Sequence, residues 1–303
     1  MIHVWSGLTI VFLTGFLQCR MDPVALPCGE WTNETHAYRI VGTDTLLLDL
    51  RLPHCPPTAP GIVFVHGGGF QGGQRDSGPT SAWLDSMAAA GIFSASISYR
   101  LSMRDKGFGC DVSIPEKRKA VQLAGEDLLA ALDWLEARTG MGYPEHWIAA
   151  GSSAGAETAL WSGYVQAPQR WAGVISFSGA LESGTGRPDA TPPLFAVHGT
   201  CDRVVPPFEA IHRGCPPHAV GAWPLVGGLA WGDSLRHAGG LAATWAVCGG
   251  DHMVCNEAME NPYVREKLIQ WMQDPATHSA TWSSNKEGLL MDQGSSSCPH
   301  PCN

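Results

Sequence analysis

Two apolar runs that end in glycine-rich turns place the strongest constraint on this chain. Residues 62–65 (IVFV) lead into HGGGF at residues 66–70, and residues 147–150 (WIAA) lead into GSSAG at residues 151–155. Short apolar runs bounded by turn residues are typical of buried strands. Glycine lets the chain turn tightly and lets another group approach the backbone closely. The sequence therefore predicts two strands whose ends form parts of a site.

The two turns together indicate acyl-transfer chemistry. That chemistry needs a serine on a sharp strand-to-helix turn, which assigns Ser153 as nucleophile. It also needs backbone N–H groups aimed at the developing oxyanion, for which we expect Gly68, Gly69 and Ala154. With 36 glycines among 303 residues, a chance G-x-S-x-G is expected in roughly a third of such chains, and H-G-G-G in roughly a few per cent. The alternative is a pair of purely structural turns.

A nucleophilic serine needs a base, and the base needs an orienting acid. Asp202 follows the apolar residues 193–197, and His252 follows the apolar residues 246–248. Both lie just past a predicted strand, where an open α/β sheet collects its functional residues. The chain order of serine, acid and histidine also fits a G-x-S-x-G turn. We therefore expect Asp202 as the acid and His252 as the base.

Three other residues compete for roles at this site. His198 precedes the turn that carries the acid, so we interpret it as a structural histidine that hydrogen-bonds the loop. Asp251 adjoins His252 and is poorly placed to reach the imidazole Nδ1. Glu157 lies one turn into the helix after the serine, where we expect a surface or first-turn charge favoured by the helix dipole.

With these motifs the chain resembles the α/β-hydrolase superfamily, and more narrowly the small bacterial serine esterases of the acetylesterase and carbohydrate-esterase kind. The resemblance spans roughly residues 38–273 and rests on residues 66–70, 99–101, 127–135, 151–155, 198–206 and 249–252. It implies the same nucleophile, acid, base and oxyanion donors. Ser152 departs from the pattern, because many relatives carry Asp, Glu or Gly there. This departure bears on the substrate class rather than on the catalytic logic.

Apolar strands alternate with helical patterns along the chain. We expect strands at residues 45–52, 61–65, 92–99, 147–150, 172–177, 194–197 and 244–247, and helices at 81–90, 115–138, 154–165 and 262–272. This alternation predicts an α/β fold with a mostly parallel central sheet flanked by helices on both faces, as in the α/β-hydrolase fold. Residues 178–191 are too few for a large lid domain. We therefore expect an open site, with residues 206–240 and 102–113 as opposite walls.

Charge and chemistry limit the partners. With 28 acidic and 19 basic residues the formal net charge is −9, which argues against nucleic acid and against an anionic membrane surface. A small-molecule or carbohydrate ester is the expected partner. Because a triad and water suffice for the reaction, we expect no cofactor. Residues 298–302 (CPHPC) are a weak candidate for a metal site, since two Cys and one His are few ligands, and we expect no metal.

The chain divides into three predicted segments. Residues 8–17 (LTIVFLTGFL) are too few to span a bilayer and fit the apolar part of a signal peptide, so residues 1–19 are the expected leader. The following LQC faintly resembles a lipoprotein cleavage site, which would attach the chain to a membrane through Cys19. We expect residues 22–273 to form the catalytic domain and residues 274–303 a polar, loosely ordered tail. The protein would then be secreted, periplasmic or lipid-anchored.

The ten cysteines agree with export, because disulfides persist in oxidising compartments. Loss or lipidation of Cys19 leaves nine, so at least one thiol should be free. Cys298 and Cys302 could close a local bridge, and a bridge between Cys201 and Cys248 could brace the acid and base turns. Connectivity stays open at the level of sequence.

The sequence thus predicts a serine esterase that hydrolyses short-chain carboxylic esters through an acyl-enzyme, with acylated carbohydrates as candidate substrates. A serine peptidase or amidase on the same fold is an alternative, because a triad does not separate ester from amide cleavage. A non-catalytic binding protein is the remaining alternative, and the complete set of serine, histidine, acid and HGGG argues against it.

Overall fold

The computed structural model describes residues 29–189, 192–274, 281–284, 290–291, 298 and 302, with the backbone alone for residues 281–284 and 290–291. The predicted leader and Cys19 lie outside the described residues.

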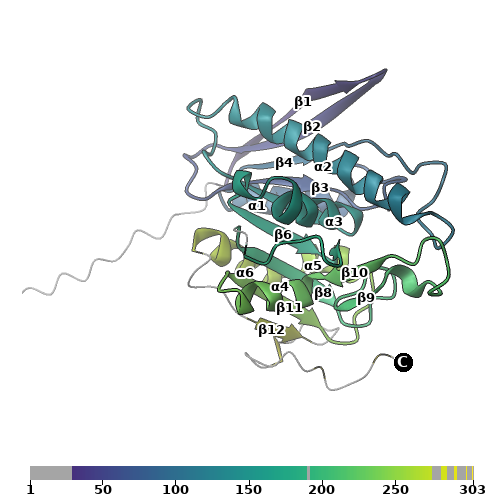
Figure 1. Ribbon diagram of the computed structural model, residues 1–303. Helices are drawn as coiled ribbons and strands as arrows, with labels where there is room; N and C mark the ends of the chain where they lie inside the picture. Colours follow the sequence, from purple (N-terminus) through teal and green to yellow (C-terminus); the bar gives the residue numbers. More distant parts are fainter. Residues whose placement is uncertain are drawn as a thin grey trace, which may run out of the picture.

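A single ten-stranded sheet forms the centre of the molecule (Figure 1). Its strand order is β1-β2-β4-β3-β5-β6-β8-β11-β12-β13. Neighbours from β4 to β12 run parallel, whereas β1, β2 and β13 pair antiparallel with their neighbours. The strands are β1 (Trp31–Val41), β2 (Asp44–Pro53), β3 (Gly61–Val65), β4 (Ser94–Ile97), β5 (Trp147–Ser152), β6 (Gly173–Phe177), β8 (Leu194–Gly199), β11 (Ala242–Val247), β12 (Thr281–Ser284) and β13 (Leu290–Met291).

Helices cover both faces of the sheet. Because side chains alternate along a strand, β3 sends Ile62 and Phe64 to one face and Val63 and Val65 to the other. The first face packs against α1 (Gly78–Ala89), α5 (Val254–Glu260) and α6 (Pro262–Gln273), and the second against α2 (Ile114–Glu136), α3 (Ala154–Trp161) and α4 (Gly228–His237). Two buried cores therefore enclose a mostly parallel sheet, which confirms the predicted α/β architecture.

The predicted elements are present with shifts of a few residues at their ends. The predicted helix at residues 154–165 is α3 continued by a π-helical turn, Ser162–Gln166, and a 3-10 turn, Pro168–Arg170, follows it. The sequence patterns missed β1, α4 and α5. β1 alternates polar and apolar residues at the sheet edge, and α5 has only seven residues. Such elements carry a weak periodic signal and form through their contacts with the rest of the fold.

A small second sheet lies beside the main one. It consists of β7 (Ala180–Glu182), β10 (Pro224–Gly227) and β9 (Glu209–Ile211), all antiparallel, with a 3-10 turn at His212–Gly214 after β9. The described residues between β6 and β8 hold only β7 and turns, as expected for a chain that has no large lid domain at this point.

The described residues within the segment 274–303 are attached to the domain. β12 extends the sheet by pairing parallel with β11, and disulfides fix Cys298 and Cys302. Most of residues 274–303, for which we expected a loosely ordered tail, lie outside the described residues. Polar residues can still complete a sheet edge, because the ladder is made by backbone groups, and cysteines can fasten a segment that buries little apolar surface.

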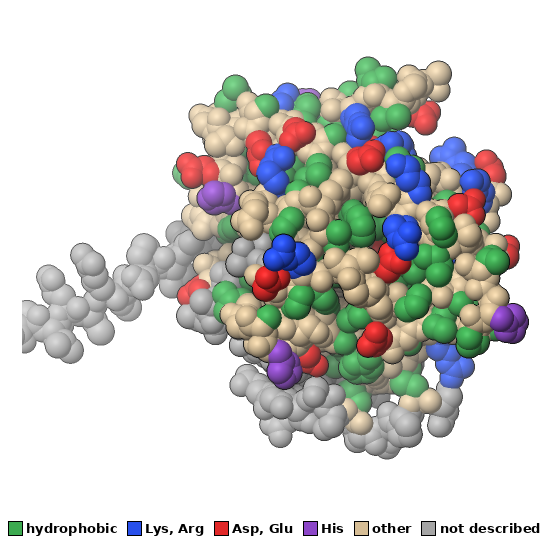
Figure 2. Space-filling model, viewed as in Figure 1, with side chains coloured by type: hydrophobic (Ala, Val, Ile, Leu, Met, Phe, Trp, Pro, Cys, Tyr) green, Lys and Arg blue, Asp and Glu red, His purple; other side chains and the backbone are tan. Residues whose placement is uncertain are grey.

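The visible surface is mixed in charge. Acidic and basic side chains are interspersed over the face shown in Figure 2, with apolar side chains between them. Among the described helices, none is both long and apolar enough to cross a bilayer.

Candidate active site

Ser153 lies on the sharp turn between β5 and α3. Its backbone has φ 51° and ψ −121°, an unusual conformation for a residue with a side chain. Gly151 and Gly155 make the turn sterically feasible. A Cβ on Gly151 would meet the backbone of Gly155, and a Cβ on Gly155 would meet the carbonyl of Val65. The predicted steric reason for glycines around the serine is therefore seen directly in the packing.

The glycine-rich turn after β3 lies against the serine turn. The Gly67 N–H donates to the Ser152 hydroxyl, with 3.2 Å between N and Oγ. Ser152, which departs from the pattern of many relatives, therefore connects the two halves of the site. The Tyr99 hydroxyl donates to the His66 carbonyl at 3.0 Å and holds the start of the same turn.

The structure brings the three predicted residues together. Ser153 Oγ lies 2.8 Å from His252 Nε2, and His252 Nδ1 lies 2.7 Å from Asp202 Oδ2. Ser153 follows β5, Asp202 follows β8 and His252 follows β11, so the three side chains come from the same ends of parallel strands, with β6 between β5 and β8. The rival Asp251 accepts instead from the Met253 N–H at 2.9 Å and is exposed.

The carboxylate of Asp202 is held by contacts on both oxygens. Oδ1 accepts from the N–H groups of Val204 and Val205 at 2.8 and 2.9 Å. His198 Nε2 donates to the Val205 carbonyl at 3.0 Å and lies 3.3 Å from Asp202 Oδ2. Burial by itself raises the pKa of Asp202, but hydrogen bonds and charge from His198 and His252 outweigh it and hold the pKa well below its ordinary value. Asp202 is therefore ionised, and His198 has the structural contact that we expected.

The three expected oxyanion donors lie on the two glycine-rich turns of the site. Gly68 and Gly69 line the same cavity as Ser153 and His252. Ala154 is the first residue of α3, so its N–H has no acceptor within the helix. Across the part of the chain that the structure describes, no hydrogen bond uses the N–H of Gly68 or Gly69. Gly68 has φ 112°, and a Cβ there would meet the carbonyl of Gly72, so this loop depends on glycine.

The cavity beside Ser153 has a volume of about 460 Å³, within the range of small-molecule sites. One expected wall is partly right, since Arg213 from residues 206–240 lines it. The other is wrong, because residues 71–80 contribute to the lining and residues 102–113 do not. Phe108 instead packs in the core against Phe70, which leaves that segment behind the glycine turn. The lining residues are His66, Gly67, Gly68, Gly69, Gln71, Gly73, Gln74, Ser77, Thr80, Ser152, Ser153, Val204, Arg213, His252, Met253, Cys255 and Asn256.

Glu157 is buried rather than on the surface, which corrects the sequence expectation. Its helix α3 packs between the sheet and α2, so the side chain four residues after Ser153 points into the protein. Burial raises the pKa of Glu157 to about 8, against smaller opposing effects from Arg213 and Lys117. Lys117 is buried nearby and donates to the Gly221 carbonyl at 2.8 Å. A polar cluster thus lies directly behind the serine turn.

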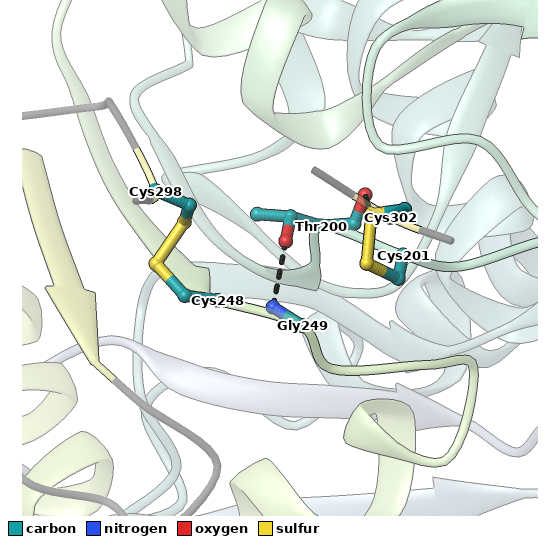
Figure 3. The surroundings of a disulfide bond; sticks show 6 residues. All are labelled: Thr200, Cys201, Cys248, Gly249, Cys298 and Cys302. Carbon is teal, nitrogen blue, oxygen red and sulfur yellow. Dashed lines mark hydrogen bonds between the residues drawn. A yellow bond between two sulfur atoms is a disulfide. The ribbon is translucent and has the colours of Figure 1, made fainter. Parts of the chain in front are cut away.

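Disulfides flank the loops that carry Asp202 and His252 (Figure 3). Cys201 pairs with Cys302, and Cys248 pairs with Cys298. Between them the Gly249 N–H donates to Thr200 Oγ1 at 2.9 Å and links the two loops. Both sequence alternatives, a local Cys298–Cys302 bridge and a Cys201–Cys248 bridge, are therefore wrong, because spacing along the chain does not report which loops meet. The pairing also leaves no thiol at residues 298 and 302 for a metal.

The remaining described cysteines divide between bridges and one thiol. Cys110 pairs with Cys215, and Cys55 is also disulfide-bonded. Cys255 is the free thiol among the described residues, in agreement with the odd count, and burial raises its pKa to about 12.

Comparison with solved structures finds bacterial esterases. A butyrate-bound structure of Est2 from the planctomycete Thermogutta terrifontis superposes with a TM-score of 0.55 at 18% identity, covering 80% of this chain and 95% of that one. Brefeldin A esterase, a bacterial homologue of human hormone sensitive lipase, gives a TM-score of 0.56 at 19% identity, covering 83% and 80%. This chain has the α/β-hydrolase fold. Comparison with protein-family models and with curated proteins gives no match.

Sequence reasoning missed several residues of this site because they lie on loops or on a short helix. Arg213, Gln71 and Asn256 all line the cavity, yet each comes from a loop or short helix with no periodic pattern. In the sequence Ser152 is only a departure from the pattern of relatives, and its contact with Gly67 depends on two strands being neighbours. No local sequence signal identifies such residues, because their role comes from the approach of distant segments.

Proposed function

We propose that this protein is a serine hydrolase that cleaves carboxylic esters, with Ser153 as nucleophile, His252 as base and Asp202 as orienting acid. The observation that carries the proposal is the unbroken chain of hydrogen bonds from Ser153 Oγ through His252 to Asp202 on the wall of an open cavity. Three side chains at these distances have the geometry that activates a serine hydroxyl.

In the proposed reaction, Ser153 Oγ attacks the ester carbonyl while its proton passes to His252 Nε2. Asp202 keeps the imidazole in the required tautomer through Nδ1 and stabilises the imidazolium. The Nε2 proton then goes to the leaving alkoxide as the C–O bond breaks, which leaves an acyl-enzyme. Water repeats the sequence, with His252 as base, to release the acid and restore the serine.

The backbone N–H groups of Gly68, Gly69 and Ala154 are the proposed oxyanion donors. They are well suited because they are fixed by the fold and need no reorganisation as charge develops on the carbonyl oxygen. Loss of one such donor typically lowers the rate by roughly a hundredfold or more.

Short acyl groups are the proposed substrates. The described chain has no large lid, and the cavity is open. The structural neighbour from Thermogutta terrifontis has been solved with butyrate and with propionate bound, which agrees with a site for short acids. Acyl groups on carbohydrate remain candidates, since an open site accommodates a bulky alcohol.

The test is a substrate panel on the purified protein and its Ser153→Ala variant. The panel contains p-nitrophenyl acetate, p-nitrophenyl butyrate, long-chain esters and, as the carbohydrate substrate, acetylated xylan. We expect the acetate and butyrate to be hydrolysed and the long-chain esters to be hydrolysed poorly. Ser153→Ala should abolish turnover and covalent labelling by a fluorophosphonate. Unchanged turnover in the variant would refute the proposal. Cleavage of aminoacyl arylamides instead of esters would identify a peptidase or amidase.

We also propose that the protein is exported from the cytoplasm. Three disulfides join described cysteines, and such bonds persist in oxidising compartments. Expression of the full chain with cell fractionation tests this, because an exported protein is recovered outside the cytoplasm with its disulfides formed.

A further inference from the structure

Arg213 is an unpaired cation in the wall of the proposed ester site. It lines the cavity together with Ser153 and His252 and is exposed. In the described part of the chain no carboxylate lies within ion-pair distance of its guanidinium, whereas eight other arginines are ion-paired: Arg39, Arg51, Arg75, Arg100, Arg118, Arg170, Arg187 and Arg236.

The charge of Arg213 stays unneutralised within the cavity. Arg213 is the one permanently charged residue among the lining residues, and none of those described is acidic, although the chain has 28 Asp and Glu against 19 Lys and Arg. The carboxyl group of Glu157 interacts with it electrostatically, but the pKa of Glu157 is raised to about 8, so this group is largely neutral near pH 7. Asp202 lines a neighbouring cavity together with Arg213, and both of its oxygens are already engaged by other groups. Arg213 is therefore available to an anion that enters the cavity.

The backbone holds Arg213 in place at a cost in free energy. Its φ of 57° lies in the left-handed region, which disfavours residues with a Cβ. Its N–H donates to the Val204 carbonyl at 2.9 Å, and the Cys110–Cys215 disulfide anchors the chain two residues later. Replacing Arg213 by glycine would remove this strain, because glycine adopts a positive φ readily. Strained conformations that the surrounding structure fixes this firmly are concentrated at functional sites.

We infer that Arg213 binds an ionised acid group of the substrate, so that the enzyme prefers esters carrying a carboxylate or similar oxyanion beside the cleaved bond. This inference rests on the proposed esterase function and names its substrate class. Arginine suits the role because its planar guanidinium forms paired, charge-assisted hydrogen bonds with a carboxylate. The acid group can belong to the acyl part or to the alcohol part of the ester.

Two matched substrate pairs test the inference by pH-stat. Monoethyl succinate against its neutral isostere ethyl isocaproate places the charge on the acyl side. Para-acetoxybenzoate against its methyl ester places it on the alcohol side. In each pair the measured quantity is the ratio of kcat/KM for the anionic ester to that for the neutral ester. We expect Arg213→Gln to lower this ratio by about 10- to 100-fold in at least one pair, mainly through KM.

Three further variants separate charge from structure. Arg213→Lys should give a ratio between those of wild type and Arg213→Gln, because lysine keeps the positive charge but lacks the planar guanidinium that forms paired hydrogen bonds. Arg213→Gly should lower the ratio as Arg213→Gln does while folding at least as stably as wild type, since glycine tolerates this φ. Arg104→Gln, an exposed arginine away from the cavity, is the matched control and should leave the ratio unchanged. The ratio in wild type should also fall with added salt.

The possible failures are distinguishable. If wild type hydrolyses none of the four paired esters and no p-nitrophenyl acetate, the esterase function itself fails. If neutral esters are hydrolysed but Arg213→Gln and Arg213→Gly leave the ratio unchanged in both pairs, the function stands and the anion subsite is overturned. A loss confined to one pair supports the inference and identifies which side of the ester carries the acid group.

Discussion

At the scale of single residues, the carboxylate of Asp202 is held by several hydrogen bonds at once. It receives two backbone N–H groups on one oxygen and the His252 imidazole on the other, with His198 close by. A neutral amide in its place can keep the backbone contacts through its oxygen. It would then present an NH₂ group to His252 Nδ1 and favour the wrong tautomer of the imidazole.

Asp202→Asn should therefore lower kcat for ester hydrolysis by roughly 10³- to 10⁴-fold. Turnover of p-nitrophenyl acetate measures the effect, and thermal unfolding of the same preparation shows whether the loop is intact. A variant that folds normally and retains wild-type kcat would contradict the orienting role of Asp202.

Much of this arrangement could be predicted from the order of residues, because a serine, an acid and a histidine each follow a strand. The contact of His198 with Asp202, and the position of Arg213, could not. Both depend on the path of the loops after β8, and loop paths are set by tertiary contacts and disulfides rather than by local propensity.

At the scale of elements, α3 depends on Gly155. A Cβ there would meet the carbonyl oxygens of Val65 and His66 at the end of β3, so the helix would have to move away from the sheet. Gly155→Ala should destabilise the protein by about 3 kcal/mol or more, despite the better helix propensity of alanine. Gly78→Ala, where nothing lies within 4 Å, is the control and should change stability by less than about 0.5 kcal/mol. Urea unfolding of both variants measures the difference, and equal midpoints would contradict the packing argument.

The same helix carries the buried Glu157, which makes stability depend on pH. Its folded pKa of about 8 lies above the ordinary value of 4.5, so between these values the folded state holds a proton that the unfolded state has lost. This contribution to stability is complete below about pH 4.5 and decreases as pH rises through about 8, by at most about 1.4 kcal/mol per pH unit.

Glu157→Gln should abolish that pH dependence. The variant should match wild type near pH 5 and be more stable near pH 9, because the amide never has to ionise inside the protein. Urea unfolding at the two pH values tests this. A stability difference between variant and wild type that does not grow with pH would show that Glu157 is ionised in the folded protein throughout.

Elements with clear apolar patterns, such as β3, β5 and α2, could be located from the sequence, because a strand buried on both faces is a continuous apolar run and a helix buried on one face has an apolar period. β1 and α5 could not. The first is an edge strand with many exposed polar residues, and the second is too short for a period to show.

At the scale of the whole molecule, two disulfides join the acid and base loops to residues near position 300. The paired cysteines are 101 and 50 residues apart, and Cys201 directly precedes Asp202. Replacing Cys201 and Cys302 together by Ser should lower the free energy of unfolding by about 2–5 kcal/mol. It should also lower ester turnover, because the loop of the acid loses its attachment.

Replacing Cys110 and Cys215 by Ser is the comparison for this prediction. It removes a bridge of similar span, 105 residues, that does not hold Asp202 or His252. We expect it to lower stability while fluorophosphonate labelling of Ser153 persists. Equal loss of labelling in both double variants would show that the disulfides act on the fold as a whole and not on the acid loop.

Both of those bridges join a loop to a segment that comes later in the chain, and this has a consequence for how the protein is made. Ribosomes build the chain from its N-terminus, so the segments bearing Asp202 and His252 emerge before Cys298 and Cys302 exist. Fastening of the proton-relay loops is therefore a late event in biogenesis, one that also requires an oxidant. A freshly made, still reduced polypeptide should have its nucleophile turn in place well before its relay is secured.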